Sequence, residues 1–596
     1  MILKKEYLFN KFNLPESDHI FKFYGDNIQE SVHIIDWLYQ YNKDKMRFIS
    51  IEYISLSEYV YIYDIGGEKY YFIALAYYHN GAIPYEVRKC ITVLDKPDVV
   101  VYSVKENKVI MGFETTETGF QGNATWQRTG RVINFAERKY PFAYLAFYSK
   151  TDQSQENIRE PGYLFVLMFN LLSLEYATHT MVGFSEHPDK SHWLDKKAPQ
   201  KDMKPPIFNY LYSLIIGKSD LECLENAYYN MKEYYFSDPK LEKTVSEFGS
   251  NNLSYMREEG FEKNILENIN SEQNIPFFHA DKLVFEFNPT KINKEKFKQF
   301  FPDIKFMAIS KNSTAGITFE TAELVSFLND KTKMYIEDLI ENKIEEPTII
   351  IPTKMTKKQN GKLIFTDDPY NGEIIAFANM YRQSFPEANI ILLLCDHTNS
   401  NEYDVEDAKG RKIYKAIDKY ADILIDLDYN VFSNESEKFR VEKRDRYEKI
   451  FTTEDDVTSF FGTILHSENI EVSFLNPPSG SWSDIKLLPS NGYYYLQRNE
   501  KRGDIAYFDR EESIYYVGES KKDYSSLKNS LQDEYFKTKN LSEIIVNKLQ
   551  NKYPYKTFAI FKGDEDEADK ILKDSKFDMV IIVDDSENIS LKVFER

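Results

Sequence analysis

Residues 503–522 read GDIAYFDREESIYYVGESKK and contain two short apolar runs separated by a charged turn. Asp504 opens the first run, and the second run ends in Glu519, Ser520 and Lys521. Runs of this length and composition are typical of strands. Because alternate residues of a strand share a face, the side chains of Glu519 and Lys521 are expected to point the same way. A charged surface hairpin would have the same pattern, so the flanking sequence has to separate the two interpretations.

The flanking residues predict a defined order of elements. A helix is expected over EDDVTSFFGTILHSEN, with acidic residues in its first turn, and a strand over IEVSFLN. The two runs of the hairpin follow, and then a long helix that begins near Ser525 and a fourth strand, KTFAIFK. A further helix and strand lead to residue 596. This order predicts a mixed sheet covered by helices.

Asp504 followed by Glu519-Ser520-Lys521 resembles the PD-(D/E)xK motif of a nuclease superfamily, whose core has the same order of elements. The resemblance covers about residues 450–596 and departs from the motif at Gly503, where the motif has Pro. It implies that Asp504 and Glu519 bind Mg²⁺, which Mn²⁺ can replace. It also implies that Lys521 orients or helps to deprotonate the attacking water and offsets phosphate charge.

The chemistry of phosphodiester hydrolysis favours the same residues independently of the resemblance. Two carboxylates on adjacent strands can share one hard divalent cation, whose other ligands are water and phosphate oxygens. An acidic residue on the preceding helix often completes such sites, and Glu454, Asp455 and Asp456 are the candidates. Capping of the helix start is the alternative role for each of these three residues.

Residues 97–149 repeat this layout in a less regular form. Pro97-Asp98 opens one strand, and Glu114 ends the next at nearly the interval that separates Asp504 from Glu519. Thr116 stands where the lysine is expected, and Gln127 comes early in the following expected helix. This part resembles type II restriction enzymes with an E-x-T strand followed by a Gln-Arg helix. Asp98 and Glu114 are therefore predicted metal ligands of a second site, with Thr116 and Gln127 as further catalytic residues; a scaffold without activity is the competing interpretation.

Nucleic-acid binding has to be reconciled with an acidic chain. The sequence has 75 Lys and Arg against 95 Asp and Glu, a net charge of −20, which argues against a surface coated with basic residues. A local basic groove on an acidic body remains compatible with this balance. The predicted DNA contacts are Arg128, Arg131, Arg498, Arg502 and Lys522.

The length of 596 residues predicts at least two domains, with a globular composition of 42% hydrophobic and 29% charged residues. The expected fold class is α/β, mixed α+β, with two PD-(D/E)xK-type nuclease domains separated by helical and α/β regions. The predicted divisions are an N-terminal nuclease-like domain (1–160), a mostly helical region (161–275), a mixed segment that takes part in DNA recognition (276–345), and a C-terminal α/β region (346–596).

Several other functions are disfavoured by the sequence. Cys90, Cys223 and Cys395 lie far apart, which argues against disulfides and zinc and fits a reducing cytoplasm. No signal peptide is expected, and no apolar run approaches the roughly 18 residues of a membrane span. His179, His187 and His192 have spacings that suit neither a zinc finger nor a zincin. A phosphate-binding Gly-Lys-Ser/Thr loop is absent, so NTP binding is disfavoured.

These observations lead to one expected function and two alternatives. We expect a Mg²⁺-dependent type II restriction endonuclease of the prokaryotic cytoplasm that cuts double-stranded DNA, one strand per nuclease domain. A DNA methyltransferase encoded nearby is the expected partner, and a monomer and a homodimer are both compatible with the sequence. The alternatives are a nicking or phage-defence nuclease of the same fold, and a DNA-binding or assembly protein built on decayed nuclease folds.

Overall fold

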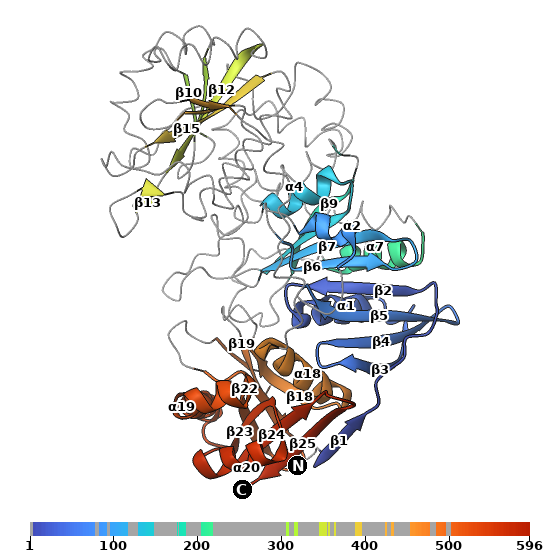
Figure 1. Cartoon of the computed structure of the whole chain (residues 1–596), viewed down its shortest axis with the longest axis vertical. Helices are drawn as coiled ribbons and strands as arrows, with labels where there is room; N and C mark the ends of the chain where they lie inside the picture. Colours follow the sequence, from blue (N-terminus) through green and yellow to red (C-terminus); the bar gives the residue numbers. More distant parts are fainter. Residues whose placement is uncertain are drawn as a thin grey trace.

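The computed structural model describes residues 4–77, 83–91, 96–116, 129–147, 176, 178–185, 204–218, 453–476, 484–490, 492–495 and 502–596, and the backbone of short strands between residues 305 and 433. Within those ranges the chain is mixed α/β, with three multistranded sheets and several helices, as the sequence predicts (Figure 1).

The C-terminal sheet has seven strands in the order β1-β25-β24-β23-β22-β21-β18. Its strands are β1 (Glu6–Phe9), β18 (Glu471–Leu475), β21 (Ile505–Asp509), β22 (Ile514–Asp523), β23 (Tyr555–Lys562), β24 (Met579–Asp584) and β25 (Ile589–Glu595). Its helices are α18 (Glu454–Ser467), α19 (Tyr524–Lys548) and α20 (Glu565–Asp574), and the hairpin of β19 (Asp484–Leu487) and β20 (Gly492–Tyr495) lies beside it. The predicted order of helix, three strands, helix and strand is therefore present, with this hairpin inserted after β18.

Strand β22 is the centre of the C-terminal sheet. It pairs antiparallel with β21 and parallel with β23, and both α18 and α19 pack against it. Residues 515–521 are all buried, because helices and strands cover both faces of the strand. The charged residues that end this strand therefore lie inside the fold and not on a surface hairpin.

The N-terminal sheet has eight strands in the order β3-β4-β5-β2-β6-β7-β8-β9. They are β2 (Ile20–Gly25), β3 (Arg47–Ser55), β4 (Glu58–Ile65), β5 (Glu68–Ala76), β6 (Val99–Ser103), β7 (Lys108–Thr116), β8 (Phe142–Phe147) and β9 (Thr180–Ser185). The associated helices are α1 (Ile28–Tyr41), α2 (Tyr85–Cys90), α4 (Thr129–Glu137) and α7 (Lys204–Ile215). Strand β9 comes from the segment predicted to be mostly helical, so this sheet extends past residue 160.

A third sheet comes from the middle of the chain and has the order β10-β11-β12-β15-β16-β17. Its strands are β10 (Lys305–Ala308), β11 (Ala315–Phe319), β12 (Glu345–Lys354), β15 (Ala388–Cys395), β16 (Ile423–Ile425) and β17 (Val431–Ser433), with a separate hairpin of β13 (Thr356–Lys357) and β14 (Leu363–Ile364). The parallel pairing of β12, β15 and β16 agrees with the α/β character predicted for this region.

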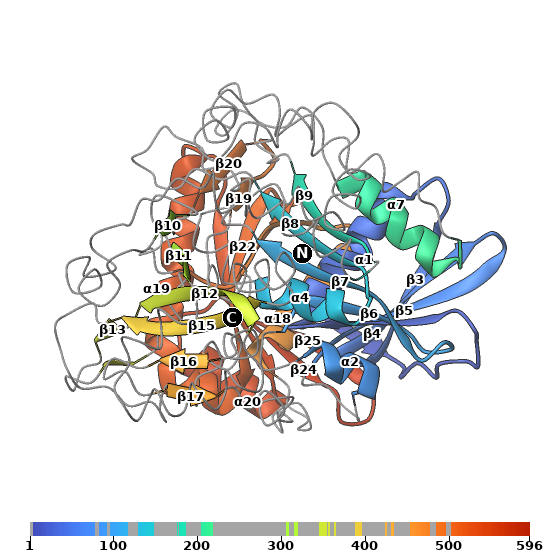
Figure 2. The same ribbon diagram turned by 90° about the horizontal axis from the view of Figure 1, so that it is seen from above.

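The N-terminal and C-terminal sheets share one hydrophobic core. Helix α1 packs against α18 (Figures 1 and 2). The ring of Phe460 on α18 contacts the rings of Phe9 and Tyr53 edge-on. Strand β1 pairs with β25, so the start of the chain completes the C-terminal sheet before the N-terminal sheet begins. Residues 6–9 and 589–592 are therefore neighbours in one sheet.

The two sheets have the same arrangement of strands around their centres. In the series β2-β6-β7-β8-β9 the successive pairings are antiparallel, antiparallel, parallel and parallel. The series β18-β21-β22-β23-β24 has the same four pairings in the same order. In each series a helix, α4 or α19, connects the first parallel pair of strands. The predicted likeness between the two halves is therefore present in the pairing of their strands.

Candidate metal centre

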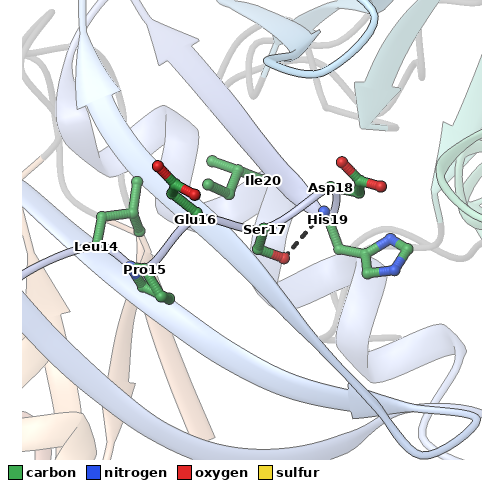
Figure 3. Close-up of a pocket in the computed structure, with 7 residues that line it drawn as sticks. All are labelled: Leu14, Pro15, Glu16, Ser17, Asp18, His19 and Ile20. Carbon is green, nitrogen blue, oxygen red and sulfur yellow. Dashed lines mark hydrogen bonds between the residues drawn. The ribbon is translucent and has the colours of Figure 1, made fainter.

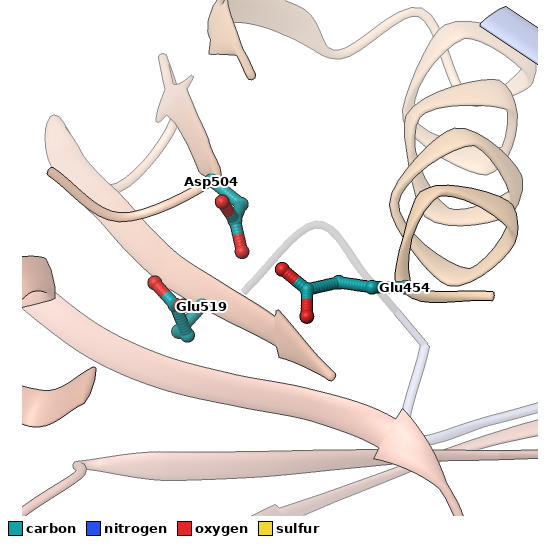
Figure 4. Close-up of side chains that lie close together, drawn as sticks. All are labelled: Glu454, Asp504 and Glu519. Atoms are coloured by element: carbon teal, nitrogen blue, oxygen red, sulfur yellow. The ribbon is translucent and has the colours of Figure 1, made fainter. Parts of the chain in front are cut away.

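Three carboxylates meet where α18, β21 and β22 come together. Asp504 immediately precedes β21, Glu519 lies within β22, and Glu454 is the first residue of α18. Figure 4 shows the three side chains pointing toward one another. Each offers one oxygen to a group whose members all lie within 4.8 Å of one another, which is close enough to hold a single ion. Asp504 and Glu519 are 6% and 2% exposed, so two of the three are inside the fold.

Neighbouring acidic residues in the first turn of α18 have different roles. Asp456 forms a capping box with Thr453, in which each side chain accepts a hydrogen bond from the backbone N–H of the other residue. Glu454 faces the carboxylates of the sheet instead. Of the three acidic candidates in this turn, Asp456 thus has the capping role and Glu454 belongs to the cluster.

Asp504 is held in place by neutral donors. Its Oδ2 accepts hydrogen bonds from the backbone N–H and the hydroxyl of Ser520, both at 3.0 Å. Its Oδ1 accepts a hydrogen bond of 2.9 Å from the side-chain amide of Asn476, which follows β18. The hydroxyl of Ser520 also contacts that of Thr458 on α18. Sequence reasoning missed Asn476 and Thr458, since only the tertiary fold brings them beside Asp504.

Gly503, the departure from the motif, has a structural reason. A Cβ at this position would lie 2.7 Å from the carbonyl oxygen of Gly518, because β21 and β22 approach closely here. Proline carries a Cβ as every other non-glycine residue does, so the position that holds proline in the motif accepts only glycine in this chain.

Lys521 lies at the centre of a set of acidic groups. Its Nζ is 2.7 Å from Glu519 Oε1, 3.1 Å from Glu454 Oε2 and 3.8 Å from Glu534 Oε1. Glu534, on α19, also pairs with Lys537 at 2.7 Å. Sequence reasoning missed Glu534. The signal was an acidic residue among the inward-facing positions of the long helix, which is unusual for a buried helix face.

Burial and neighbouring charge shift the pKa values of this cluster. Burial, then Asp504, and then the adjacent carboxyl of Glu534 raise the pKa of Glu519 well above its usual range. Burial and the charge of Asp504 also raise the pKa of Glu454. Burial opposes ionisation of Glu534, but contact with Glu519 and Lys537 outweighs it and lowers the pKa of Glu534 to about 2. One proton or cation therefore has to compensate the neighbouring carboxyls of Glu519 and Glu534.

A second observation marks the same place. Glu519 Oε2 is buried and has no hydrogen-bond partner among the described residues while the carboxyl is ionised. A buried carboxylate oxygen without a partner is costly, and a proton or a metal ion can satisfy it. Oxygen donors of this kind are the ligands that Mg²⁺ and Mn²⁺ prefer. Glu454, Asp504 and Glu519 can thus hold a divalent cation beside Lys521.

The N-terminal sheet contains a comparable cluster. Asp98 immediately precedes β6, and Glu114 lies within β7. Asp98 Oδ2 accepts hydrogen bonds from the backbone N–H and the hydroxyl of Thr115, at 2.6 Å and 3.0 Å. Arg131, on α4, is in an ion pair with both carboxylates, 3.2 Å from Asp98 Oδ1 and in closer contact with Glu114 Oε2. The sequence predicted that Asp98 and Glu114 lie in one cluster, and they do. It predicted Arg131 as a DNA contact, whereas Arg131 lies between the two acids.

The other predicted site residues are distributed as follows. The side chain of Arg502 lies over the ring of Phe474, with its guanidinium carbon 5.9 Å from the ring centroid, and Lys522 is exposed at the end of β22. The backbone of Thr116 belongs to β7, but its side chain is outside the described part of the chain, as are Gln127, Arg128 and Arg498. Among the histidines, His179 packs edge-on against Tyr210, and His187 and His192 fall outside the described residues. The predicted DNA contacts remain predictions.

Two further features lie apart from these clusters. A shallow, open depression runs along residues 14–20, between β1 and β2, and contains none of the clustered carboxylates (Figure 3). In the described ranges, no helix is both long and apolar enough to cross a membrane. Neither feature changes the assignment of the candidate site.

No protein-family model, curated protein or solved structure matches the chain.

Proposed function

We propose that the chain is a Mg²⁺-dependent endodeoxyribonuclease that hydrolyses phosphodiester bonds at the cluster of Glu454, Asp504 and Glu519. The observation that carries the proposal is the buried Glu519 carboxylate, which has an unsatisfied oxygen, two acidic neighbours within reach of one ion, and a lysine at 2.7 Å. Structural ion pairs also bury charge, but most buried polar atoms in such pairs have a hydrogen-bond partner, so an unsatisfied carboxylate oxygen favours a site for a proton or a cation.

The residues have separate roles in this proposal. Glu519, Asp504 and Glu454 hold the cation, which supplies charge stabilisation for the phosphate and a water of lowered pKa. Ser520 and Asn476 keep the Asp504 carboxylate oriented toward the other two. This support from neutral donors keeps the local negative charge available for the cation.

Lys521 contributes positive charge and not basicity. Burial acts to lower its pKa, but the carboxylates of Glu519 and Asp504 outweigh burial and raise it. The ammonium group therefore stays protonated and can neutralise phosphate oxygens or hold the attacking water by hydrogen bonding. In the metal-free chain, the raised pKa of Lys521 favours orienting the water over removing its proton.

The fold supports a nuclease of the PD-(D/E)xK type. The order of α18, β18, β21, β22, α19 and β23 is the one that the motif predicts, and Asp504 and Glu519 lie on neighbouring strands of it. On this basis the substrate is duplex DNA, and the biological role is restriction in the prokaryotic cytoplasm beside a cognate DNA methyltransferase. The proposed fold includes two nuclease-like halves, because the strand pairings of the two sheets agree.

A second candidate function applies to the N-terminal half. Arg131 lies between Asp98 and Glu114, so this cluster already holds a cationic group. That observation favours a nuclease-like half that binds or positions DNA without cutting it. A nicking or phage-defence nuclease is the corresponding role for the whole chain.

Incubation of the purified protein with supercoiled plasmid tests the proposal. We expect nicked or linear product in Mg²⁺ and none in excess EDTA, and we expect Glu519→Gln to lower the rate of plasmid cleavage by about 100-fold or more, because it removes a charged ligand. Glu471→Gln is the matched control, since Glu471 lies on β18 and pairs with Arg510 away from the cluster. Cleavage of either strand that persists in EDTA, or at the parent rate in Glu519→Gln, would exclude this site as the hydrolytic centre.

A further inference from the structure

The carboxylate clusters of the two sheets occupy equivalent places in the backbone. Val99, which follows Asp98, pairs with the residue before Glu114, and Ile505, which follows Asp504, pairs with the residue before Glu519. Each aspartate therefore stands in the same register relative to the glutamate on the next strand.

The hydrogen bonds around the two aspartates are also equivalent. Asp98 Oδ2 accepts from the N–H and hydroxyl of Thr115, as Asp504 Oδ2 does from Ser520. In both cases the donor is the residue after the glutamate. This agreement in both register and hydrogen bonding indicates that the clusters are two versions of one site.

Helices α1 and α18, which pack against each other, each carry an acidic residue in the first turn. Glu454 is in the first turn of α18, and Glu30 is in the first turn of α1, the helix that packs against α18. Glu30 Oε2 is buried and has no hydrogen-bond partner within the described ranges. Burial, followed by the charges of Asp98 and Glu114, raises the pKa of Glu30 well above its usual range. Among the described residues, only Glu454, Asp504 and Glu519 bring three such ligand atoms within 4.8 Å of one another, so Glu30 is a neighbour of the N-terminal pair and not a third ligand. Sequence reasoning missed Glu30.

The two versions differ in the group that contacts Oδ1 of the aspartate. In the C-terminal cluster, Asp504 Oδ1 accepts from the neutral amide of Asn476. In the N-terminal cluster, Asp98 Oδ1 pairs with the guanidinium of Arg131, which also contacts Glu114 Oε2. The same Arg131 nitrogen, Nη1, reaches both acids, so it stands where an ion bridging them would stand. A guanidinium keeps its charge at every physiological pH, unlike a histidine.

Burial makes this arrangement persistent. The side chain of Glu114 is 1% exposed, that of Asp98 13% and that of Arg131 17%. A buried charge pair is costly to break, because the remaining partner is left uncompensated in a medium that solvates it poorly. To bind here, a hydrated divalent ion would have to displace the guanidinium and also lose part of its shell of bound water, and both steps cost free energy.

We propose that the N-terminal pair of Asp98 and Glu114 is a latent divalent-cation site in which the guanidinium of Arg131 replaces the metal ion, so that each chain binds one divalent cation at the C-terminal cluster. The proposal for the cluster in the N-terminal sheet extends beyond the proposed function. It concerns which cation fills that site, and it does not depend on whether the chain cuts DNA.

Mn²⁺ binding, counted without DNA by the electron paramagnetic resonance signal of the free ion, tests the proposal. We expect Arg131→Met to bind one Mn²⁺ more than the parent chain, and the double variant Arg131→Met with Glu114→Gln to lose that additional ion. Arg131→Lys keeps a positive charge and should bind the same number as the parent. No additional ion in a folded Arg131→Met variant, or an additional ion in Arg131→Lys as well, would overturn the proposal.

Two further measurements cover the case in which Arg131→Met folds poorly. Glu114→Gln alone should bind as many Mn²⁺ ions as the parent chain, and a loss of one ion would show that the parent already holds metal at this cluster. Mn²⁺ should also raise the melting temperature of Arg131→Met by several degrees more than that of the parent, since an ion bound to the folded state stabilises it. An equal rise in both proteins contradicts a latent site.

Discussion

Asp504 accepts two hydrogen bonds of 3.0 Å from Ser520, one from the backbone N–H and one from the hydroxyl. Ser520 stands between Glu519 and Lys521 on β22, so this contact fixes the carboxylate at the head of one strand relative to the charged residues of the next. The hydroxyl of Ser520 also meets Thr458 on α18, the helix that carries Glu454. One small side chain thus links the three elements that form the proposed metal centre.

Loss of this hydroxyl should impair catalysis more than folding. In Ser520→Ala, Asp504 keeps the hydrogen bond from the backbone N–H and loses the other, so we expect kcat to fall by about tenfold, which corresponds to about 1.4 kcal/mol. Plasmid cleavage under single-turnover conditions measures this effect.

The C-terminal sheet offers a matched control for that substitution. Thr557 donates its N–H and hydroxyl to Asp578 at 2.7 Å and 2.8 Å, in the same manner but away from the carboxylate cluster. Thr557→Val should lower the melting temperature by a similar amount and leave kcat unchanged. Equal effects of the two variants on kcat would show that the Ser520 contact has only a structural role.

The identity of the metal should decide between binding and cleavage. The proposed ligands are oxygen atoms, so Mg²⁺ and Mn²⁺ should support cleavage, and Ca²⁺ should support DNA binding without it because of its larger and less regular coordination. Gel-shift and cleavage assays on one oligonucleotide duplex separate the two. Cleavage in Ca²⁺ at the rate seen in Mg²⁺ would argue against a site that depends on ion geometry.

Replacement of Glu519, a proposed metal ligand of the C-terminal cluster, should abolish cleavage of both DNA strands. If Arg131 replaces the metal in the N-terminal cluster, a chain with Glu519→Ala has no hydrolytic site, and supercoiled plasmid should stay intact. A catalytic N-terminal cluster predicts something different, namely open-circular plasmid with nicks in one defined strand. Gel electrophoresis followed by sequencing of nick positions distinguishes these outcomes, and strand-specific nicks would establish Asp98 and Glu114 as a working site.

The stability of the metal-free chain should depend on pH through Asp455. Burial, then the charges of Glu454 and Asp504, raises the pKa of Asp455 from 3.8 to about 6. Because the folded-state pKa is the higher one, the stability that this group contributes is present below about pH 4 and is lost as the pH rises through 6. The side chain in Asp455→Asn stays neutral. The melting temperature of this variant relative to that of the parent should therefore be higher at pH 7.5 than at pH 4.5, both measured in EDTA.

The exposed carboxylate of Asp566 provides the control for this pH effect. It lies in the first turn of α20, as Asp455 lies in the first turn of α18. Asp566→Asn therefore removes a carboxylate from the same position of a helix without the burial, and it should show a smaller change with pH. A constant difference between Asp455→Asn and the parent at both pH values would contradict the pKa shift.

DNA binding should weaken steeply with salt despite the net charge of −20. Each phosphate that a lysine neutralises releases counterions, so Lys522→Gln should reduce the slope of log K against log salt by about one. Lys570→Gln is the control, since Lys570 is exposed on α20, which packs against β24. An affinity that stays constant from low to physiological salt would rule out a basic groove.

The sequence by itself determined the strand pair that carries Asp504 and Glu519. Apolar runs of period two, a turn between them and helical patterns on either side are local signals, and they agree with the strands and helices that form. The same reasoning brought Asp98 and Glu114 together, because neighbouring antiparallel strands place such residues side by side. It also anticipated a capping role in the first turn of α18, which Asp456 fulfils.

Only the tertiary structure decided which groups surround these carboxylates. Asn476 and Glu30 come from a strand end and a helix, and their sequence neighbourhoods do not differ from those of ordinary polar positions. Glu534 stands among the inward-facing positions of α19, but its partners there come from distant segments. Arg131 resembles a DNA-binding residue in the sequence and lies between two acids in the fold. The physical reason is that burial and charge pairing arise from contacts between distant segments, and the pKa shifts of the site follow from those contacts and not from local sequence.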